Sequence, residues 1–156
     1  MEFLLEKLAR EAVEEEKRER EREQIANERA AQRRLEEVQA RFRTLLTAIL
    51  PEMVEQAYFT SKDNGYNSYN AYTAYSCAVL PAAQGIAVSL IWTNRTEITV
   101  QNEAYPALYE VVKWDERDNI GIAGRTIRRH LLVAIASVLD MVRKAETTRE
   151  ANRAAA

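Results

Sequence analysis

The chain has 156 residues, of which 47% are hydrophobic and 29% are charged, and its formal net charge at pH 7 is -2. This composition excludes a disordered chain, and the balance of charge excludes a global polycation that would bind nucleic acid or an anionic membrane surface. No apolar run approaches the roughly 20 residues of a membrane-spanning helix, and the start MEFLLEKLAR lacks a secretory-signal pattern, so we expect a cytoplasmic protein that does not bind membranes.

Residues 1–50 are expected to form one continuous helix, the first part of the chain. They contain no Gly and no Pro, and the strong helix formers Ala, Leu, Glu, Arg and Gln predominate. Residues 14–23 are ten consecutive charged side chains, which excludes a coiled-coil core there. Glu14 with Arg18, and Glu16 with Arg20, form i,i+4 pairs in the favourable order, so this segment can stay helical without a partner.

The second half of this helix carries an apolar seam with the 3-4-3-4 spacing of coiled-coil a and d positions. A weaker seam opens the chain at Leu5, Leu8 and Ala12. Such a stripe places apolar side chains along a partner helix, and a dimer or higher oligomer is the simplest assembly it would make. The longer seam therefore predicts an oligomer interface formed by Leu35, Val38, Phe42, Leu45 and Ile49.

The same seam also fits a helix that folds back on its own domain. Leu46 and Leu50 widen the apolar face near the carboxyl end of the helix, as packing against a sheet would require. Both arrangements coexist if residues 42–58 pack on the domain and the residues before them do not.

Residues 51–146 are expected to form a small globular domain. Pro51 lacks a backbone donor, so the long helix should end or kink near Leu50, with MVEQAYF adding a further turn or two. The Asn-Gly pair in SKDNGYN predicts a loop. Segments rich in β-branched or aromatic residues and joined by short connections then predict a four-stranded antiparallel meander, made of Tyr72–Leu80, Ile86–Thr93, Thr96–Gln101 and Leu108–Trp114.

A closing helix is expected over residues 124–145, because its apolar residues fall on one face and can cover the sheet. The tail, residues 147–156, is expected to fray. The predicted fold class is therefore α+β: a long N-terminal helix that is partly coiled coil, a four-stranded antiparallel β-meander, and a C-terminal helix packed on the sheet.

The stretch NGYNSYNAYTAY sets a tyrosine at every third position, a period that fits neither a helix nor a strand. Tyr72 and Tyr75 are expected in the sheet. Tyr66 and Tyr69 are expected in the preceding loop, where tyrosine offers large contact area at low entropic cost, so they are the candidate protein-contact loop.

No residue pattern predicts catalysis, a metal site or a cofactor. His130 is the only histidine and Cys77 the only cysteine, so a His/Cys zinc site cannot be built. Cys77 lies in the apolar run YSCAVL, where a thiol acts as a small hydrophobic side chain. We therefore expect a protein that is not an enzyme and that has no cofactor.

The stretch NIGIAGRTIRRH resembles the I-G-x-x-G-x-x-I signature of KH nucleic-acid-binding domains over eight residues, 120–127. Its middle is Ile122-Ala123, and no later strand completes that fold, so the family is not predicted. A candidate anion-binding site remains at the start of the last helix, formed by Gly121, Gly124, Arg125, Arg128 and Arg129. Neutralisation of these arginines by the acidic stretch 115–118 is the alternative, and it needs no ligand.

The order of a coiled coil, a helix, a four-strand meander and a helix is similar to RWD-type domains of kinetochore proteins, and Tyr105-Pro106 resembles their Tyr-Pro turn. The function we expect is a non-enzymatic, homo-oligomeric protein-binding or assembly module. Its helix would join subunits, and its sheet or tyrosine loop would contact another protein. The alternative is nucleic-acid or phosphate binding through the arginine cluster, which the balanced charge does not favour.

Overall fold

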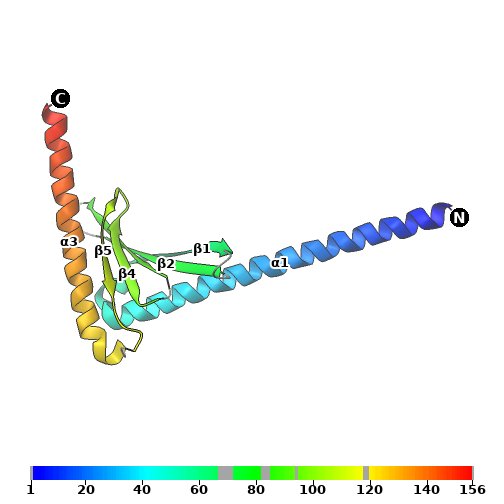
Figure 1. Cartoon of the computed structure of the whole chain (residues 1–156), viewed down its shortest axis with the longest axis horizontal. Helices are drawn as coiled ribbons and strands as arrows, with labels where there is room; N and C mark the ends of the chain where they lie inside the picture. The colour runs from blue at the N-terminus through cyan, green and yellow to red at the C-terminus, as the bar shows by residue number, and fades with distance from the viewer. Residues whose placement is uncertain (1, 67–71, 82–84, 94, 118–119, 156) are drawn as a thin grey trace. The chain divides into compact units, whose positions relative to one another are not determined.

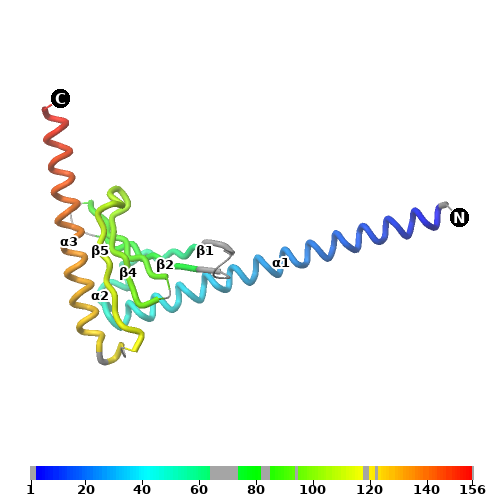
Figure 2. Tube along the Cα trace, viewed as in Figure 1, coloured from blue at the N-terminus to red at the C-terminus, as the bar shows by residue number. Residues whose placement is uncertain are grey.

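The computed structural model describes residues 2–66, 72–81, 85–93, 95–117 and 120–155. The chain divides into two compact units, residues 1–34 and residues 35–156. The elements follow one another along the chain (Figures 1 and 2) as α1 (Glu2–Ile49), α2 (Pro51–Val54), β1 (Tyr58–Tyr66), β2 (Tyr72–Pro81), β3 (Ala87–Trp92), β4 (Glu97–Asn102), β5 (Tyr105–Lys113) and α3 (Ile120–Ala155).

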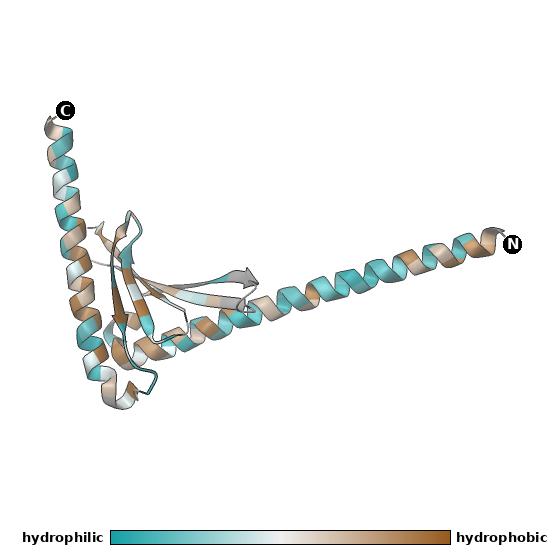
Figure 3. Ribbon diagram, viewed as in Figure 1, coloured by the Kyte–Doolittle hydropathy of each residue, from teal (hydrophilic) through white to brown (hydrophobic). Residues whose placement is uncertain are grey.

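The N-terminal unit is helical throughout its described length, and every residue from Phe3 to Arg29 is exposed. Both predicted i,i+4 pairs are formed: the Arg18 guanidinium lies 3.5 Å from the Glu14 carboxylate, and that of Arg20 lies 2.8 Å from Glu16. Figure 3 shows the charged run as a hydrophilic stretch of α1 with apolar residues toward its amino end. Because this unit buries no large side chain, ion pairs and intrinsic propensity support its helix.

The second unit confirms the predicted α+β class, with a helix on each side of an antiparallel sheet in the chain order. The sheet has five strands in the order β1-β2-β3-β4-β5 rather than the expected four. The additional strand is β1, which takes up residues that we expected to form helical turns and a loop. Its pairing runs from Tyr58 opposite Val79 to Tyr66 opposite Tyr72, with a register shift between Asp63 and Tyr66.

The core lies on one face of this sheet. Strand registers align the inward side chains of neighbouring strands, as in Ala78 opposite Leu90 and Leu90 opposite Val100. The carboxyl-terminal part of α1 and the helix α3 both contribute to this single cluster, and Figure 1 shows α3 running along β5 and β4. The side chains buried most completely are Phe42, Leu46, Ile49, Leu90, Ile98, Leu131, Val88, Val100, Val138, Val142 and Ser76.

Phe42 joins α1 to the sheet. Its ring centroid lies 5.6 Å from that of Trp92 in a stacked arrangement, and 6.0 Å from that of Phe59 at an edge-to-face angle of 79°. Arg43 lies next to it in sequence and places its guanidinium 4.6 Å from the Phe59 ring centroid. Aromatic pairs of this geometry add roughly 0.5–1.5 kcal/mol beyond the area they bury, so one side chain fixes the helix to strands β1 and β3.

Two buried polar side chains close the hairpins on either side of β4. The Trp92 indole donates a hydrogen bond to the backbone oxygen of Arg95 at 2.7 Å, which closes the β3–β4 connection. The Asn102 amide donates to Ala87 O at 2.7 Å and accepts from Ala104 N at 2.9 Å. The tight turn therefore falls at residues 103–104, and Tyr105-Pro106 begins β5 instead of forming the turn.

Helix α3 is longer than expected at both ends, because it begins at Ile120 and continues to Ala155. Its buried face consists of Ile127, Leu131, Ala134, Val138 and Val142. Four of these are apolar positions on which the prediction of a covering helix rested, whereas the fifth expected position, Ile135, is half-buried. The residues expected to fray are helical through Ala155, with Thr147 and Thr148 donating to carbonyl oxygens one turn earlier.

We expect Phe42→Ala to destabilise the protein by about 3–5 kcal/mol, the range for truncating a buried phenylalanine. The matched control is Phe3→Ala on the same helix, since Phe3 is 85% exposed whereas Phe42 is fully buried. Urea unfolding followed by tryptophan fluorescence gives both values. Equal effects of the two substitutions would contradict the placement of Phe42 at the centre of the core.

The hydroxyl of Tyr105 is buried and has no hydrogen-bond partner within the described part of the chain. Because an unpaired buried hydroxyl loses its hydration without compensation, we expect Tyr105→Phe to leave the free energy of unfolding unchanged or to raise it by about 1 kcal/mol. Thermal unfolding of the two proteins measures the difference. A clear loss of stability would show that the hydroxyl has a partner.

Candidate functional site

The predicted oligomer seam lies inside the single chain. Val38, Phe42, Leu45 and Ile49 are buried in the core, and Leu35 is half-buried. Leu46 and Leu50, which favoured the alternative of a helix folding back on its own domain, are buried beside them. For residues 38–50, packing against the chain's own sheet is therefore the observed arrangement, and a second helix has no access to these side chains.

The glycines of the predicted anion site lie in a helix rather than in the loop that the sequence suggested. Gly121 and Gly124 lie within α3, which starts at Ile120, so their backbone donors do not form a free glycine loop. Gly85 is the glycine with a left-handed backbone in the described residues, with φ of 74°. The three arginines consequently lie in the second and third turns of α3, beyond the turn where the free N–H groups of a helix are found.

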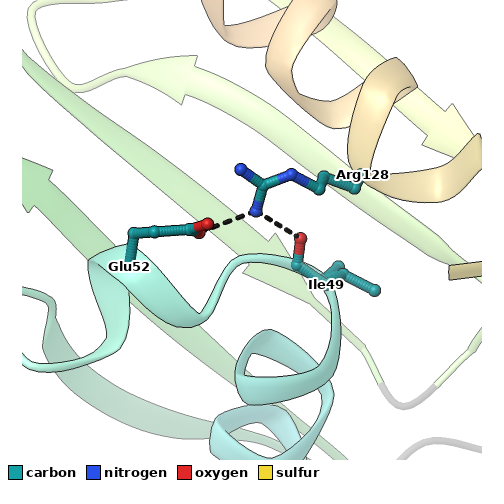
Figure 4. A network of polar contacts seen from close by, with 3 residues as sticks. All are labelled: Ile49, Glu52 and Arg128. Carbon is teal, nitrogen blue, oxygen red and sulfur yellow. Dashed lines mark hydrogen bonds and ion pairs between the residues drawn. The ribbon is translucent and has the colours of Figure 1, made fainter. Parts of the chain in front are cut away.

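Arg128 is engaged within the protein (Figure 4). Its guanidinium donates to the Glu52 carboxylate at 2.7 Å and to the backbone oxygen of Ile49 at 3.4 Å. The carbonyl of Ile49 belongs to the last turn of α1, which has no intrahelical donor available, so Arg128 caps that helix from α3. The hydrogen bond from Arg128 lowers the pKa of the Glu52 carboxyl, and the same bond raises the pKa of Arg128.

Arg125 and Arg129 are the other two arginines of the cluster. Arg125 and Arg129 are exposed, and they flank the exposed apolar side chains Leu132 and Val133 on the outer face of α3. Arg128 lines the same hollow of α3 as these residues, but its guanidinium is already paired with Glu52. A mixed cationic and apolar helix surface of this kind is suited to another protein. The acidic partner is Glu52, and sequence spacing gave no indication of it.

Of the predicted tyrosine loop, Tyr69 lies outside the described residues. Tyr66 ends β1 and pairs with Tyr72, but its side chain is also outside the described part of the structure. Tyr75 is half-buried on β2, in line with its expected place in the sheet.

The face of the sheet opposite the helices is a surface that the sequence did not indicate. The registers align a row across all five strands, Thr60, Cys77, Ile91, Thr99 and Val111. None of the described helices covers this row, in which every member is half-buried or exposed. Tyr58 and Tyr109, both largely exposed, lie on the two edge strands of the same face. Neutral side chains of this kind favour contact with a protein surface.

Burial raises the pKa of the Cys77 thiol in this row, which makes it a poor nucleophile. No group of three or more His, Cys, Asp or Glu side chains that could hold a metal ion occurs among the described residues. Over the same part of the chain, no helix is long and apolar enough to cross a membrane.

The weaker seam at the start of the chain, Leu5, Leu8 and Ala12, is exposed, and Leu4 lies beside it one turn before Leu8. Leu4, Leu5 and Leu8 are exposed by more than half, and they fall on one side of α1 because they are spaced three and four residues apart. Comparison with protein-family models, curated proteins and solved structures finds no match for this chain.

We expect Arg128→Gln to lower the melting temperature near neutral pH, because it removes both the ion pair with Glu52 and the cap on Ile49. Glu52 has a folded-state pKa below its ordinary value of 4.5, so its contribution is complete above that value and is lost as pH falls through the lower pKa. The difference in melting temperature between the two proteins should therefore shrink in acid. A part of it should remain, because Arg128 also donates a hydrogen bond to the carbonyl oxygen of Ile49. The control is Arg125→Gln at an exposed position of the same helix, and it should leave the melting temperature unchanged at any pH.

Proposed function

We propose that the protein is a non-enzymatic, homo-oligomeric assembly module. In this proposal the amino-terminal part of α1 joins subunits, and the exposed sheet face contacts a protein partner. The absence of a metal-ligand group among the described residues and the raised pKa of the Cys77 thiol support a binding role over catalysis. The engagement of Arg128 by Glu52 weakens the nucleic-acid alternative.

The observation that carries the proposal is the exposed stripe of Leu4, Leu5 and Leu8. Each leucine that leaves water gains roughly 1.5–3 kcal/mol, and this part of the helix has no core of its own to bury them in. The charged run at residues 14–23 supports its helix by local ion pairs, so the stripe is presented on an already formed helix. A short preformed apolar stripe is the feature that a second copy of the same helix can cover.

The test is the mass of the full chain by light scattering over a range of concentrations. We expect an oligomer, and we expect L4E/L5E/L8E to reduce its mass, because like charges replace the apolar contacts. The control K7Q/Q24E/N27E makes the net charge more negative by the same three units on other positions of the helix. Its mass should match that of the unsubstituted chain. A monomer at every concentration, or equal masses for all three proteins, would remove the basis of the proposal.

A further inference from the structure

Strand β5 is an edge of the sheet, with β4 as its only neighbour in the strand order, and it is nine residues long. Proteins commonly protect edge strands with bulges, inward charges or covering segments. At β5 the register shift lies near its beginning, between Gln101 and Asn102 of β4, so residues 109–113 form a regular ladder. Tyr109 and Val111 are exposed by 55% and 38%. This stretch is a regular, accessible strand edge.

The direction of the backbone groups on this edge follows from one hydrogen bond. Trp114 N donates to Thr96 O at 3.0 Å, so the backbone of residue 114 is turned toward β4. Inward and outward groups alternate along an antiparallel strand, so Val112 and Glu110 also face β4. Tyr109, Val111 and Lys113 therefore turn their N–H and C=O groups away from the sheet, where another strand could pair with them.

A groove of about 410 Å³ lies beside this edge, between β5 residues 110–113 and helix α3. From α3 it is lined by His130, Val133, Ala134 and Ser137. Val133 is 63% exposed although it is apolar, whereas Ser137 donates a hydrogen bond to the Glu110 carboxylate at 3.0 Å. The groove therefore places an exposed apolar side chain next to the outer edge of β5, the edge that does not pair with β4.

We propose that β5 pairs antiparallel with β5 of a second copy of this chain, with Val111 on the two-fold axis. This inference rests on the proposed homo-oligomeric function and assigns a second interface to it. The pairing joins two five-stranded sheets into one sheet of ten strands, with both α3 helices on the same side.

The choice of a second copy follows from the complementarity of the strand with itself. Centred on Val111, the pairing places Tyr109 opposite Lys113 of the other copy and Glu110 opposite Val112. No like charges face each other, whereas a pairing centred on Glu110 would oppose two carboxylates. The outward groups of Tyr109, Val111 and Lys113 then form about six backbone hydrogen bonds. The Lys113 stem and charge can lie over the Tyr109 ring.

The position of α3 supports the same arrangement. Among the strands α3 packs chiefly on β5, and Figure 1 shows it running beside that strand. Two β5 strands paired about 4.8 Å apart would bring the two α3 helices to either side of the axis, near the roughly 8–10 Å separation of packed helices. The groove-facing Val133 of each copy would then be covered by the α3 of the other.

The first test is disulfide trapping in the full chain, in which Cys77 is the only native cysteine. In C77S/V111C the two introduced thiols would lie on opposed residues with Cα atoms about 5.5 Å apart, within disulfide range. The matched control is C77S/T99C. Thr99 lies in the same row one strand further in, so its two copies would be about 14 Å apart, three strand spacings.

We expect C77S/V111C to form a covalent dimer at least about tenfold faster than C77S/T99C under mild oxidation, because only the first pair lies within bonding distance. Equal rates would overturn the proposed pairing. Adding L4E/L5E/L8E to C77S/V111C should leave trapping intact. If C77S/V111C is not trapped but L4E/L5E/L8E still reduces the mass of the protein, the β5 interface alone is rejected. If C77S/V111C is trapped but L4E/L5E/L8E does not change the mass, the helix interface alone is rejected.

The second test uses charge at the axis in the L4E/L5E/L8E background. V111K and V111E each place like charges opposite each other and should give monomers by sedimentation, whereas an equimolar mixture should recover the dimer. The Val111 side chain is exposed at an edge, so both variants should fold and keep the circular dichroism spectrum of the parent. A mixture that stays monomeric, or single variants that stay dimeric, would show that Val111 does not face itself. If C77S/V111C is not trapped, and an unrelated extended peptide protects the edge amides of β5 from hydrogen exchange, the occupant of this edge is a different chain and the proposal is overturned.

Discussion

The packing of Phe42 between Phe59 and Trp92, edge-to-face with the first and stacked on the second, is the contact on which the second unit depends. These three rings connect the end of α1 to strands β1 and β3, which are not neighbours in the sheet. With α1 held there, Arg128 of α3 reaches the carbonyl oxygen of Ile49 at the end of that helix, and both helices contribute to the core on one face of the sheet. The opposite face and the β5 edge are left accessible as a direct result of this one-sided covering.

The fold class and four of the strands could be predicted from sequence because each has strong alternation or a compact β-branched run. Strand β1 could not, since Phe59 is the one buried apolar residue among the β1 side chains that the structure describes, residues 58–63, and polar groups of the strand are satisfied by tertiary contacts. Ser61 donates to the Gln39 side chain at 3.4 Å, and Thr60 O accepts from Ser76 at 2.9 Å. Pairing with β2, which local propensity does not encode, makes this segment a strand.

The seam and the arginine cluster show the same limit for the candidate sites. A 3-4-3-4 spacing records only that one helix face is buried, and both a partner helix and the chain's own sheet satisfy it. Likewise, the spacing of Arg125, Arg128 and Arg129 does not reveal that Glu52, far away in sequence, engages one of them. The accessible sheet face and the β5 edge depend on strand order and register, so they become visible only in the folded chain.

The position of Phe42 also has a consequence for the order of events during protein synthesis. Trp92 is made 50 residues after Phe42, which at about 5–20 residues per second takes roughly 3–10 seconds. For most of that interval residues 38–50 have been translated, but their apolar face cannot yet be covered by the chain's own sheet. A nascent chain on a crowded polysome thus presents a coiled-coil-like stripe that is buried in the finished protein. Premature pairing between neighbouring nascent chains therefore competes with the packing of residues 38–50 on the chain's own sheet.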